Sequence, residues 1–197
     1  MATRIPPTEI TGVRGAMVKR FTKKMLGQVP EPLGVYWHNP KVLKSYLATG
    51  GKVQKWHACD LSLKSLAHMA VASLIGCSWC LDFGYFQAHN EHLDLAKARE
   101  VPRWRESDVF TPLERDVMAY AEAMSQTPPT VTDEMSARLL ERLGPPALVE
   151  LTAFIAQANV YARSNVAFGI ESDGFAKACG LKPLAEPTAR LGVASAA

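Results

Sequence analysis

Two cysteines separated by two residues, Cys77-Ser-Trp-Cys80, are the residues of this chain best suited to chemistry. They follow an apolar run that ends at Gly76, and a second helix-like run starts at Leu81. Thiols at this spacing can close a small disulfide, and the free N–H groups at a helix N-terminus favour a thiolate. The pair therefore predicts redox or nucleophilic chemistry. Half of a zinc site and two structural core thiols are the alternatives.

The zinc alternative would recruit His89 and His92, which complete the pattern C-x2-C-x8-H-x2-H. On one continuous helix the thiols and the histidines would lie about three turns apart, or ~14 Å. Bonds from zinc to its ligands are only about 2.0–2.3 Å long. We therefore expect no metal and no other cofactor, and we assign both histidines to the surface or an interface. Cys59 and Cys179 are isolated in the sequence, and structural roles are expected for both.

Length and composition are typical of one globular domain, with or without an appended arm. The chain has 197 residues, of which 48% are hydrophobic and 21% charged, and a net charge of +3. This charge does not indicate nucleic acid as a partner. No apolar run approaches the roughly 20 residues that a membrane span needs, and no apolar leader segment follows the start. Four cysteines do not make a disulfide scaffold here, so a reducing cytoplasm is the expected location.

The hydrophobic pattern predicts helices along nearly the whole chain and no strand, which indicates an all-α protein. Asn39 before Pro40 and Asp60 before Leu61 are helix-starting signals, and Thr111 to Glu114 is a capping box. The segment 147–168 is apolar on most sides and is predicted to be a central buried helix. The expected helices cover residues 14–26, 39–47, 61–75, 78–98, 111–125, 132–144, 147–168 and 173–178.

Three regions are expected: an N-terminal helical arm packed on the core (1–58), the main helical domain (59–180) and a flexible C-terminal tail (181–197). The first 26 residues carry six basic side chains against Glu9 alone. They either face an anion or partner, or form a solvated helix face that packs on its neighbour or on another subunit. The basic residues are Arg4, Arg14, Lys19, Arg20, Lys23 and Lys24.

The order of short motifs from about Asp60 to Phe168 resembles the carboxymuconolactone decarboxylase family, which includes the AhpD-like alkyl hydroperoxidases. Each motif is weak alone, but together they occur in the family's order and spacing. They are Leu63-Lys-Ser-Leu, Gly76-Cys-Ser-Trp-Cys-Leu-Asp, Phe110-Thr-Pro-Leu-Glu-Arg, Pro128-Pro-Thr-Val-Thr-Asp-Glu and Leu148-Val-Glu-Leu-Thr-Ala-Phe-Ile-Ala, followed by Asn159 and Arg163.

The resemblance implies an AhpD-like helical fold and a homo-oligomer, commonly a trimer or hexamer. It also implies a thiol peroxidase or disulfide oxidoreductase in which Cys77 and Cys80 alternate between dithiol and disulfide. Such an enzyme needs a peroxide or small apolar substrate and a thiol reductant, whose identity stays open. The helix end favours Cys77 as the thiol with the lower pKa, whereas the family pattern favours Cys80 as the cysteine that attacks the peroxide. The alternatives are a lyase or isomerase of the decarboxylase branch, which typically lacks the C-x-x-C motif, and a non-catalytic oligomeric binding protein.

Two relay residues of the AhpD-like peroxidases are missing. The family places a glutamate twelve residues before the first cysteine and a histidine four after the second, where this chain has Ser65 and Gly84. Both replacements are smaller, which predicts space beside the sulfurs that a ligand or close helix packing would fill. His68, one turn after Ser65 on the same helix face, is the candidate replacement base, although a core histidine is the alternative. Asp82 and Tyr85 are weaker candidates.

Overall fold

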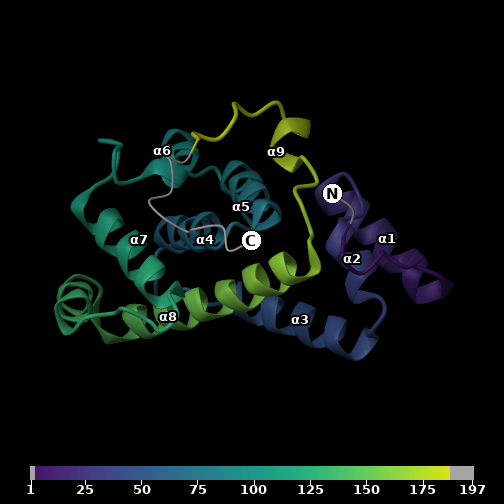
Figure 1. Ribbon diagram of the computed structural model, residues 1–197, viewed down its shortest axis with the longest axis horizontal. Coiled ribbons are helices and arrows are strands. Elements are labelled where there is room, and N and C mark those ends of the chain that lie inside the picture. Colours follow the sequence, from purple (N-terminus) through teal and green to yellow (C-terminus); the bar gives the residue numbers. More distant parts are fainter. Residues whose placement is uncertain (1–2, 187–197) are drawn as a thin grey trace, which may run out of the picture.

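A computed structural model describes residues 3–186, and this part of the chain is helical throughout, with no β-strand (Figure 1). The prediction of an all-α protein is therefore confirmed. The elements are α1 (Gly12–Leu26), α2 (Glu31–Tyr36), α3 (Pro40–Val53), α4 (Leu61–Ile75), α5 (Ser78–Asn90), α6 (Leu95–Glu100), the 3-10 helix η1 (Val101–Arg103), α7 (Pro112–Ser125), α8 (Asp133–Phe168) and α9 (Phe175–Ala178).

Helix α4 forms the centre of the molecule, between α5, α7 and α8 (Figure 1). Ala67, Met69 and Val71 are fully buried in it. The Asp60 carboxylate accepts a hydrogen bond from the Ser62 N–H at 2.8 Å, which caps the helix start. Gly76 ends α4 with a φ of 82°, a left-handed conformation that glycine adopts without a steric penalty. The predicted bounds of this helix, 61–75, are confirmed.

Helix α8 is two helical stretches joined at Gly144, whose φ of 74° and ψ of 166° are not helical. The predicted stop at Gly144-Pro145-Pro146 thus marks a real break. The prediction that residues 147–168 form a central buried helix holds for one face only. Leu151 and Ile155 are fully buried, whereas Val149 is 69% exposed on the opposite side. The stretch is apolar on most sides, yet only one face packs against the rest of the chain.

Two predicted helix ends are wrong. The expected helix 78–98 breaks after Asn90, because His92 takes a φ of 55° and the Asp94 carboxylate caps a new helix through the N–H groups of Ala96 and Lys97. Helix α3 was expected to end near residue 47 but continues through two glycines to Val53. Each glycine costs only about 1 kcal/mol relative to alanine within a helix.

Helix α2 was not predicted from the sequence, although Pro32 lies in its first turn. Proline is tolerated in the first turn of a helix, where its missing N–H would have no partner, and it occupies that position in α2. The N-terminal arm has a small apolar cluster of its own, formed by Ile10, Leu33 and Leu43.

The arm also contacts the end of α8. The Arg4 guanidinium donates to the carbonyls of Val166 and Ala167 at 2.5 and 2.8 Å. A cation at a helix C-terminus complements the partial negative charge there. One basic residue of the arm therefore has an intramolecular role.

The start of the expected flexible tail is held against the core. The Ala185 N–H donates to the Arg99 carbonyl, and the Arg99 Nε donates to the Pro183 carbonyl at 2.8 Å. Residues 183–185 thus have hydrogen-bonded contacts with Arg99, and the flexibility of the tail stays a prediction; residues 187–197 lie outside the described part of the chain. Across residues 3–186, every helix is too short or too polar to cross a membrane.

Candidate active site at the Cys77 and Cys80 pair

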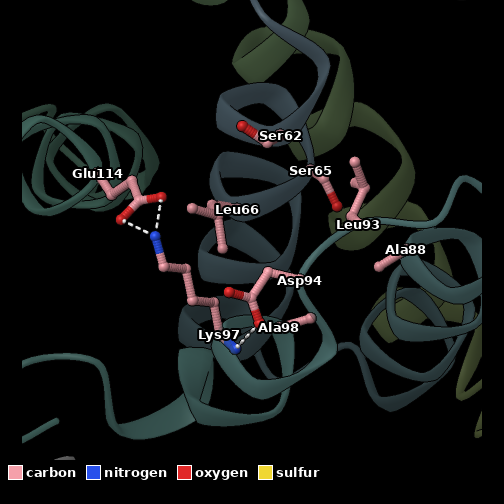
Figure 2. Close-up of a pocket in the computed structure, with 9 residues that line it drawn as sticks. All are labelled: Ser62, Ser65, Leu66, Ala88, Leu93, Asp94, Lys97, Ala98 and Glu114. Atoms are coloured by element: carbon pink, nitrogen blue, oxygen red, sulfur yellow. Dashed lines mark hydrogen bonds and ion pairs between the residues drawn. The ribbon is translucent and has the colours of Figure 1, made fainter. Parts of the chain in front are cut away.

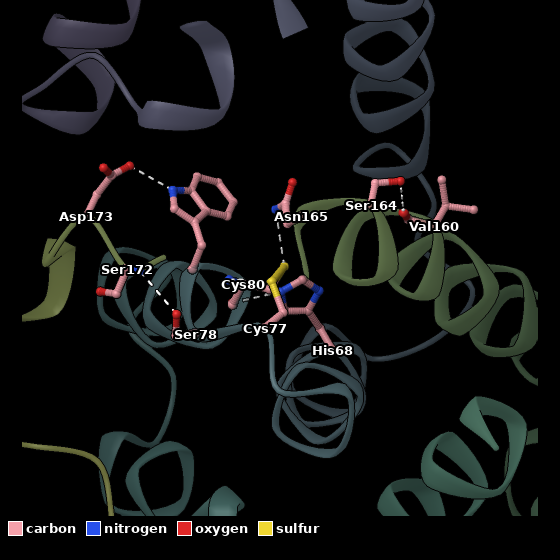
Figure 3. The surroundings of a disulfide bond; sticks show 10 residues. His68, Cys77, Ser78, Cys80, Val160, Ser164, Asn165, Ser172 and Asp173 are labelled. Atoms are coloured by element: carbon pink, nitrogen blue, oxygen red, sulfur yellow. Dashed lines mark hydrogen bonds between the residues drawn. A yellow bond between two sulfur atoms is a disulfide. The ribbon is translucent and has the colours of Figure 1, made fainter. Parts of the chain in front are cut away.

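The two cysteines lie at the turn from α4 into α5 and are joined as a disulfide (Figure 3). Their Cα atoms are 5.3 Å apart, within the usual range for a disulfide. Cys77 is the N-cap of α5, and its Sγ accepts a hydrogen bond from the Cys80 N–H at 3.2 Å. Each cysteine is only 1% exposed. The sequence thus places two thiols at a helix N-terminus, as predicted, in a setting closed to bulk water.

Asn165 is a member of this site that was not predicted from the sequence. Its side-chain Nδ2 donates to the Cys80 Sγ at 3.5 Å, and the residue is only 4% exposed. Figure 3 shows the amide of Asn165 directed at the disulfide from α8. The sequence does contain a signal for it: Asn165 continues, at helical spacing, the buried row of α8 that contains Ile155, Ala158 and Ala162. A polar residue in an otherwise apolar row indicates a specific partner.

His68 reaches the site from α4. Its Nε2 lies 3.2 Å from the backbone carbonyl of Cys80, and the ring lies beside the disulfide in Figure 3. Because a carbonyl can only accept, the Nε2 carries the proton in this contact. Burial lowers the pKa of His68 and outweighs the opposite effect of the hydrogen bond, so the neutral ring is favoured. His68 is therefore adjacent to Cys80, as expected for a candidate base.

The space expected at Gly84 is filled. A Cβ at this position would lie 2.9 Å from the His68 Cδ2 and 2.9 Å from the Met69 Cγ. Contacts that short require the neighbours to move. Of the alternatives expected here, a ligand or close helix packing, the structure contains close packing of α4 on α5.

Ser65 faces a different part of the molecule. It lines a cavity of about 180 Å³ between α4, α6 and α7, together with Ala88, Leu93 and the ion pair of Lys97 and Glu114 (Figure 2). Neither cysteine lines this cavity. The two positions that hold the relay pair in AhpD-like peroxidases therefore have separate surroundings in this protein.

The weaker candidates have structural partners. The Asp82 carboxylate accepts hydrogen bonds from the Ser172 hydroxyl and from the N–H groups of Phe175 and Ala176, which fastens the segment before α9 onto α5. The Tyr85 side chain is buried, and this burial raises its pKa.

The remaining cysteines and histidines lie apart from the pair. Burial raises the pKa of Cys59 to about 11, and Cys179 is exposed. His89 is at the other end of α5, where its Nδ1 contacts Asn90. Among residues 3–186, no three histidine, cysteine or acidic side chains are grouped as metal ligands.

Aromatic side chains cover the outer face of α5 near the pair. Trp79 and Phe83 stack with ring centroids 4.8 Å apart, and Phe175 packs edge-on against both. The Trp79 indole N–H also donates to the Asp173 carboxylate at 2.7 Å. These contacts fix the residue between the two cysteines and hence the geometry of the turn that contains them.

Comparison with known proteins identifies the family. The family model "Carboxymuconolactone decarboxylase family" matches residues 40–123. Uncharacterized protein YnjA of Escherichia coli (strain K12) is 32% identical over 158 residues, which cover 79% of this chain and 86% of YnjA. The chain belongs to the carboxymuconolactone decarboxylase family. The family match begins at α3, inside the region expected to be an appended arm.

Solved structures agree on the fold of this family member. The debrominase Bmp8, crystallised with one cysteine replaced by alanine and with 2,3,4-tribromopyrrole bound, superposes with a TM-score of 0.77 at 22% identity, covering 90% of this chain and 96% of Bmp8. An uncharacterized peroxidase-related protein from Ralstonia eutropha, described as an AhpD core, gives a TM-score of 0.75 at 15% identity over 89% of this chain and 95% of that chain. The AhpD-like fold expected from the sequence is thus confirmed.

Proposed function

We propose that this family member is a thiol-based oxidoreductase whose Cys77 and Cys80 alternate between dithiol and disulfide while reducing a peroxide. One observation carries the proposal: two buried sulfurs lie at bonding distance at the start of α5, and each accepts a hydrogen bond from an N–H donor. Hydrogen bonds of this kind favour the thiolate, which is the reactive form in thiol chemistry. A structural disulfide does not require such a donor on each sulfur.

In the proposed cycle the two thiols reduce one peroxide and are then regenerated by an external thiol. One thiolate attacks the peroxide ROOH, so the O–O bond breaks, a sulfenic acid forms and RO⁻ leaves to be protonated to ROH. The second cysteine attacks the sulfenic sulfur, and the S–O bond breaks with release of water. The disulfide that results is reopened by two equivalents of an external thiol, which leave as their own disulfide. A reducing cytoplasm, the location expected from the sequence, would supply that thiol.

His68 is proposed as a positioning residue of this cycle. With its Nε2–H directed at the Cys80 carbonyl, that nitrogen has no free electron pair to take a thiol proton. The contact instead joins α4 to the first turn of α5 and fixes the orientation of Cys80. The base role that the sequence suggested for His68 would fall to Nδ1, the ring nitrogen that keeps a free electron pair in this tautomer.

A second candidate is reductive dehalogenation of an aromatic substrate. It is favoured by the likeness to Bmp8 and by the aromatic side chains beside the thiols. The dithiol would supply the same two electrons, converting an aryl bromide and two thiols into the arene, the disulfide and HBr. The two candidates differ only in the oxidant, so one experiment can compare them.

Mild oxidation of the reduced protein with one equivalent of hydrogen peroxide or an alkyl hydroperoxide is expected to join Cys77 to Cys80, and dithiothreitol is expected to reverse it. Peptide mapping by mass spectrometry measures the pairing, with Cys59 and Cys179 as internal controls that stay free. Cys77→Ser and Cys80→Ser should each abolish multiple turnover. The peroxide proposal fails if both thiols stay reduced with peroxide. Disulfide formation and bromide release with a bromopyrrole alone would favour the second candidate.

We further propose that the protein assembles into a homo-oligomer, a trimer or hexamer as the family resemblance implies. Support comes from a row on α1 with no partner within the described chain. Val13, Met17, Phe21 and Met25 recur every fourth residue and are 57–81% exposed. The small exposed apolar face of α8, with Val149 and Ala156, offers a matching surface on a second copy.

Phe21→Glu is expected to shift the protein toward the monomer, because a carboxylate in the centre of an apolar contact would lose its hydration. Size exclusion coupled to light scattering gives the mass at micromolar concentration, for comparison with 21.5 kDa for one chain. Ala16→Glu adds the same charge to the same helix beside the row and serves as the matched control. A wild-type protein that elutes as a monomer would refute the proposal.

A further inference from the structure

The two sulfurs of the pair are stabilised by different kinds of donor. Cys77 Sγ receives the Cys80 N–H from the α5 backbone, in the helix-capping position. Cys80 lies one turn inside the helix and depends on a side chain from another element. Within residues 3–186, Asn165 is the side chain that donates a hydrogen bond to either sulfur. The stabilisation of Cys80 can therefore be removed by mutation, whereas that of Cys77 cannot.

The position of the Asn165 amide is fixed by the end of α8. The Asn165 carbonyl accepts the Ile170 N–H at 3.0 Å, and Gly169 closes the helix in the left-handed conformation. Arg4 holds the carbonyls of the next turn. The amide is buried, so water does not compete with the sulfur for its N–H. The hydrogen bond from a fixed donor of this kind becomes stronger when its acceptor becomes negatively charged.

We propose that Asn165 is a catalytic residue that stabilises the thiolate of Cys80; this inference rests on the proposed dithiol–disulfide function. When a thiolate of the reductant attacks Cys77 Sγ, a new S–S bond forms and the Cys77–Cys80 bond breaks. The electron pair of the broken bond goes to Cys80 Sγ, where the Asn165 N–H meets the new negative charge. A second thiol of the reductant then releases Cys77 and leaves as a disulfide. In the oxidising direction the same contact keeps Cys80 deprotonated for attack.

The test measures each thiol separately. Cys77→Ser leaves only Cys80 of the pair, and Cys80→Ser leaves only Cys77; both also carry Cys179→Ser to remove the exposed thiol. Ultraviolet absorbance of the thiolate is followed against pH, with and without Asn165→Leu. Cys59, with its pKa raised to about 11, titrates above the range of interest. These variants cannot form the disulfide, so the measurement does not depend on turnover.

Asn165→Leu is expected to raise the pKa of Cys80 by about one unit, a tenfold loss of thiolate at a given pH below the pKa, and to leave that of Cys77 unchanged. Asn159→Leu is the matched control, because Asn159 lies on the same helix but donates to Ser125. If the leucine variant does not fold, Asn165→Asp keeps the size and should raise the Cys80 pKa further through its negative charge.

An unchanged Cys80 pKa in a folded variant, or equal shifts at both cysteines, would overturn the role of Asn165. A selective shift at Cys80 in a protein that fails to cycle with peroxide or a bromopyrrole would instead refute the proposed function and leave the thiolate contact established.

Discussion

Lys64→Ala is expected to lower the free energy of unfolding by about 3–5 kcal/mol at neutral pH, because it leaves the buried Glu150 carboxylate without its cationic partner. The Lys64 Nζ lies 2.7 Å from the Glu150 Oε1 and also donates to the Trp56 carbonyl, and both side chains of the pair are largely buried. The Ala58 N–H donates to the other carboxylate oxygen at 2.7 Å. The pair thus joins α4, α8 and the loop that leads from the arm into the core.

The pH dependence of this effect has a definite sign. Burial alone would raise the pKa of Glu150, but hydrogen bonds from Lys64 and the backbone of Ala58 and Cys59, with the Lys64 charge, hold it below its usual range. A depressed carboxyl pKa adds stability that is present above the unfolded pKa of about 4.3 and is lost as pH falls through the folded value. Without Lys64, burial dominates and Glu150 is more easily protonated. The difference between variant and wild type should therefore widen as pH rises.

Urea unfolding at several pH values measures both effects. Arg138→Ala breaks the exposed pair with Asp116 and serves as the control, with an expected change of about 0–1 kcal/mol. Lys64→Met combined with Glu150→Leu removes both charges and should be close to neutral, since no unpaired charge stays buried. A double variant as unstable as Lys64→Ala would show that packing, rather than the stranded charge, causes the loss.

Local signals in the sequence predicted those parts of the fold that depend on neighbouring residues. Asp60 and Gly76 fixed the two ends of α4, and Thr111 with Glu114 formed the expected capping box at α7. The predictions failed where two local signals compete. Asp94 caps a new helix in the middle of a periodic apolar pattern, and periodicity alone does not rank those alternatives.

The site was only partly predictable because its members come from distant parts of the chain. The spacing of Cys77 and Cys80 revealed the thiols, and the family resemblance pointed to Ser65 and Gly84 as altered positions. The partner of Gly84 lies on the preceding helix, and Asn165 reaches Cys80 across 85 residues. Such pairs follow from how helices pack, which a single sequence does not specify.

Gly84→His, which restores the histidine of the AhpD-like relay, is expected to destabilise this protein rather than activate it. The new Cβ would meet His68 and Met69 at 2.9 Å, and overpacking of a core typically costs about 1–3 kcal/mol. His68→Ala alone should also be destabilising, by roughly 1–3 kcal/mol, because it removes a buried hydrogen bond to Cys80. The double variant removes the histidine of α4 and places one on the facing helix α5. The double variant should therefore be more stable than the sum of the single changes predicts, with a coupling free energy of about 0.5–3 kcal/mol.

Thermal and urea unfolding of the four proteins in this cycle give the coupling, and iodoacetamide alkylation of the reduced proteins at neutral pH tests the chemistry. As a positioning residue, His68 should leave the alkylation rate of Cys80 unchanged when it is replaced by alanine. A tenfold slower rate, about 1.4 kcal/mol in the barrier, would instead make His68 the base. Gly84→Ala is the smaller control, because its methyl group makes the same close contacts without adding an ionisable ring. Additive single effects would mean that His68 and Gly84 do not share the space between α4 and α5.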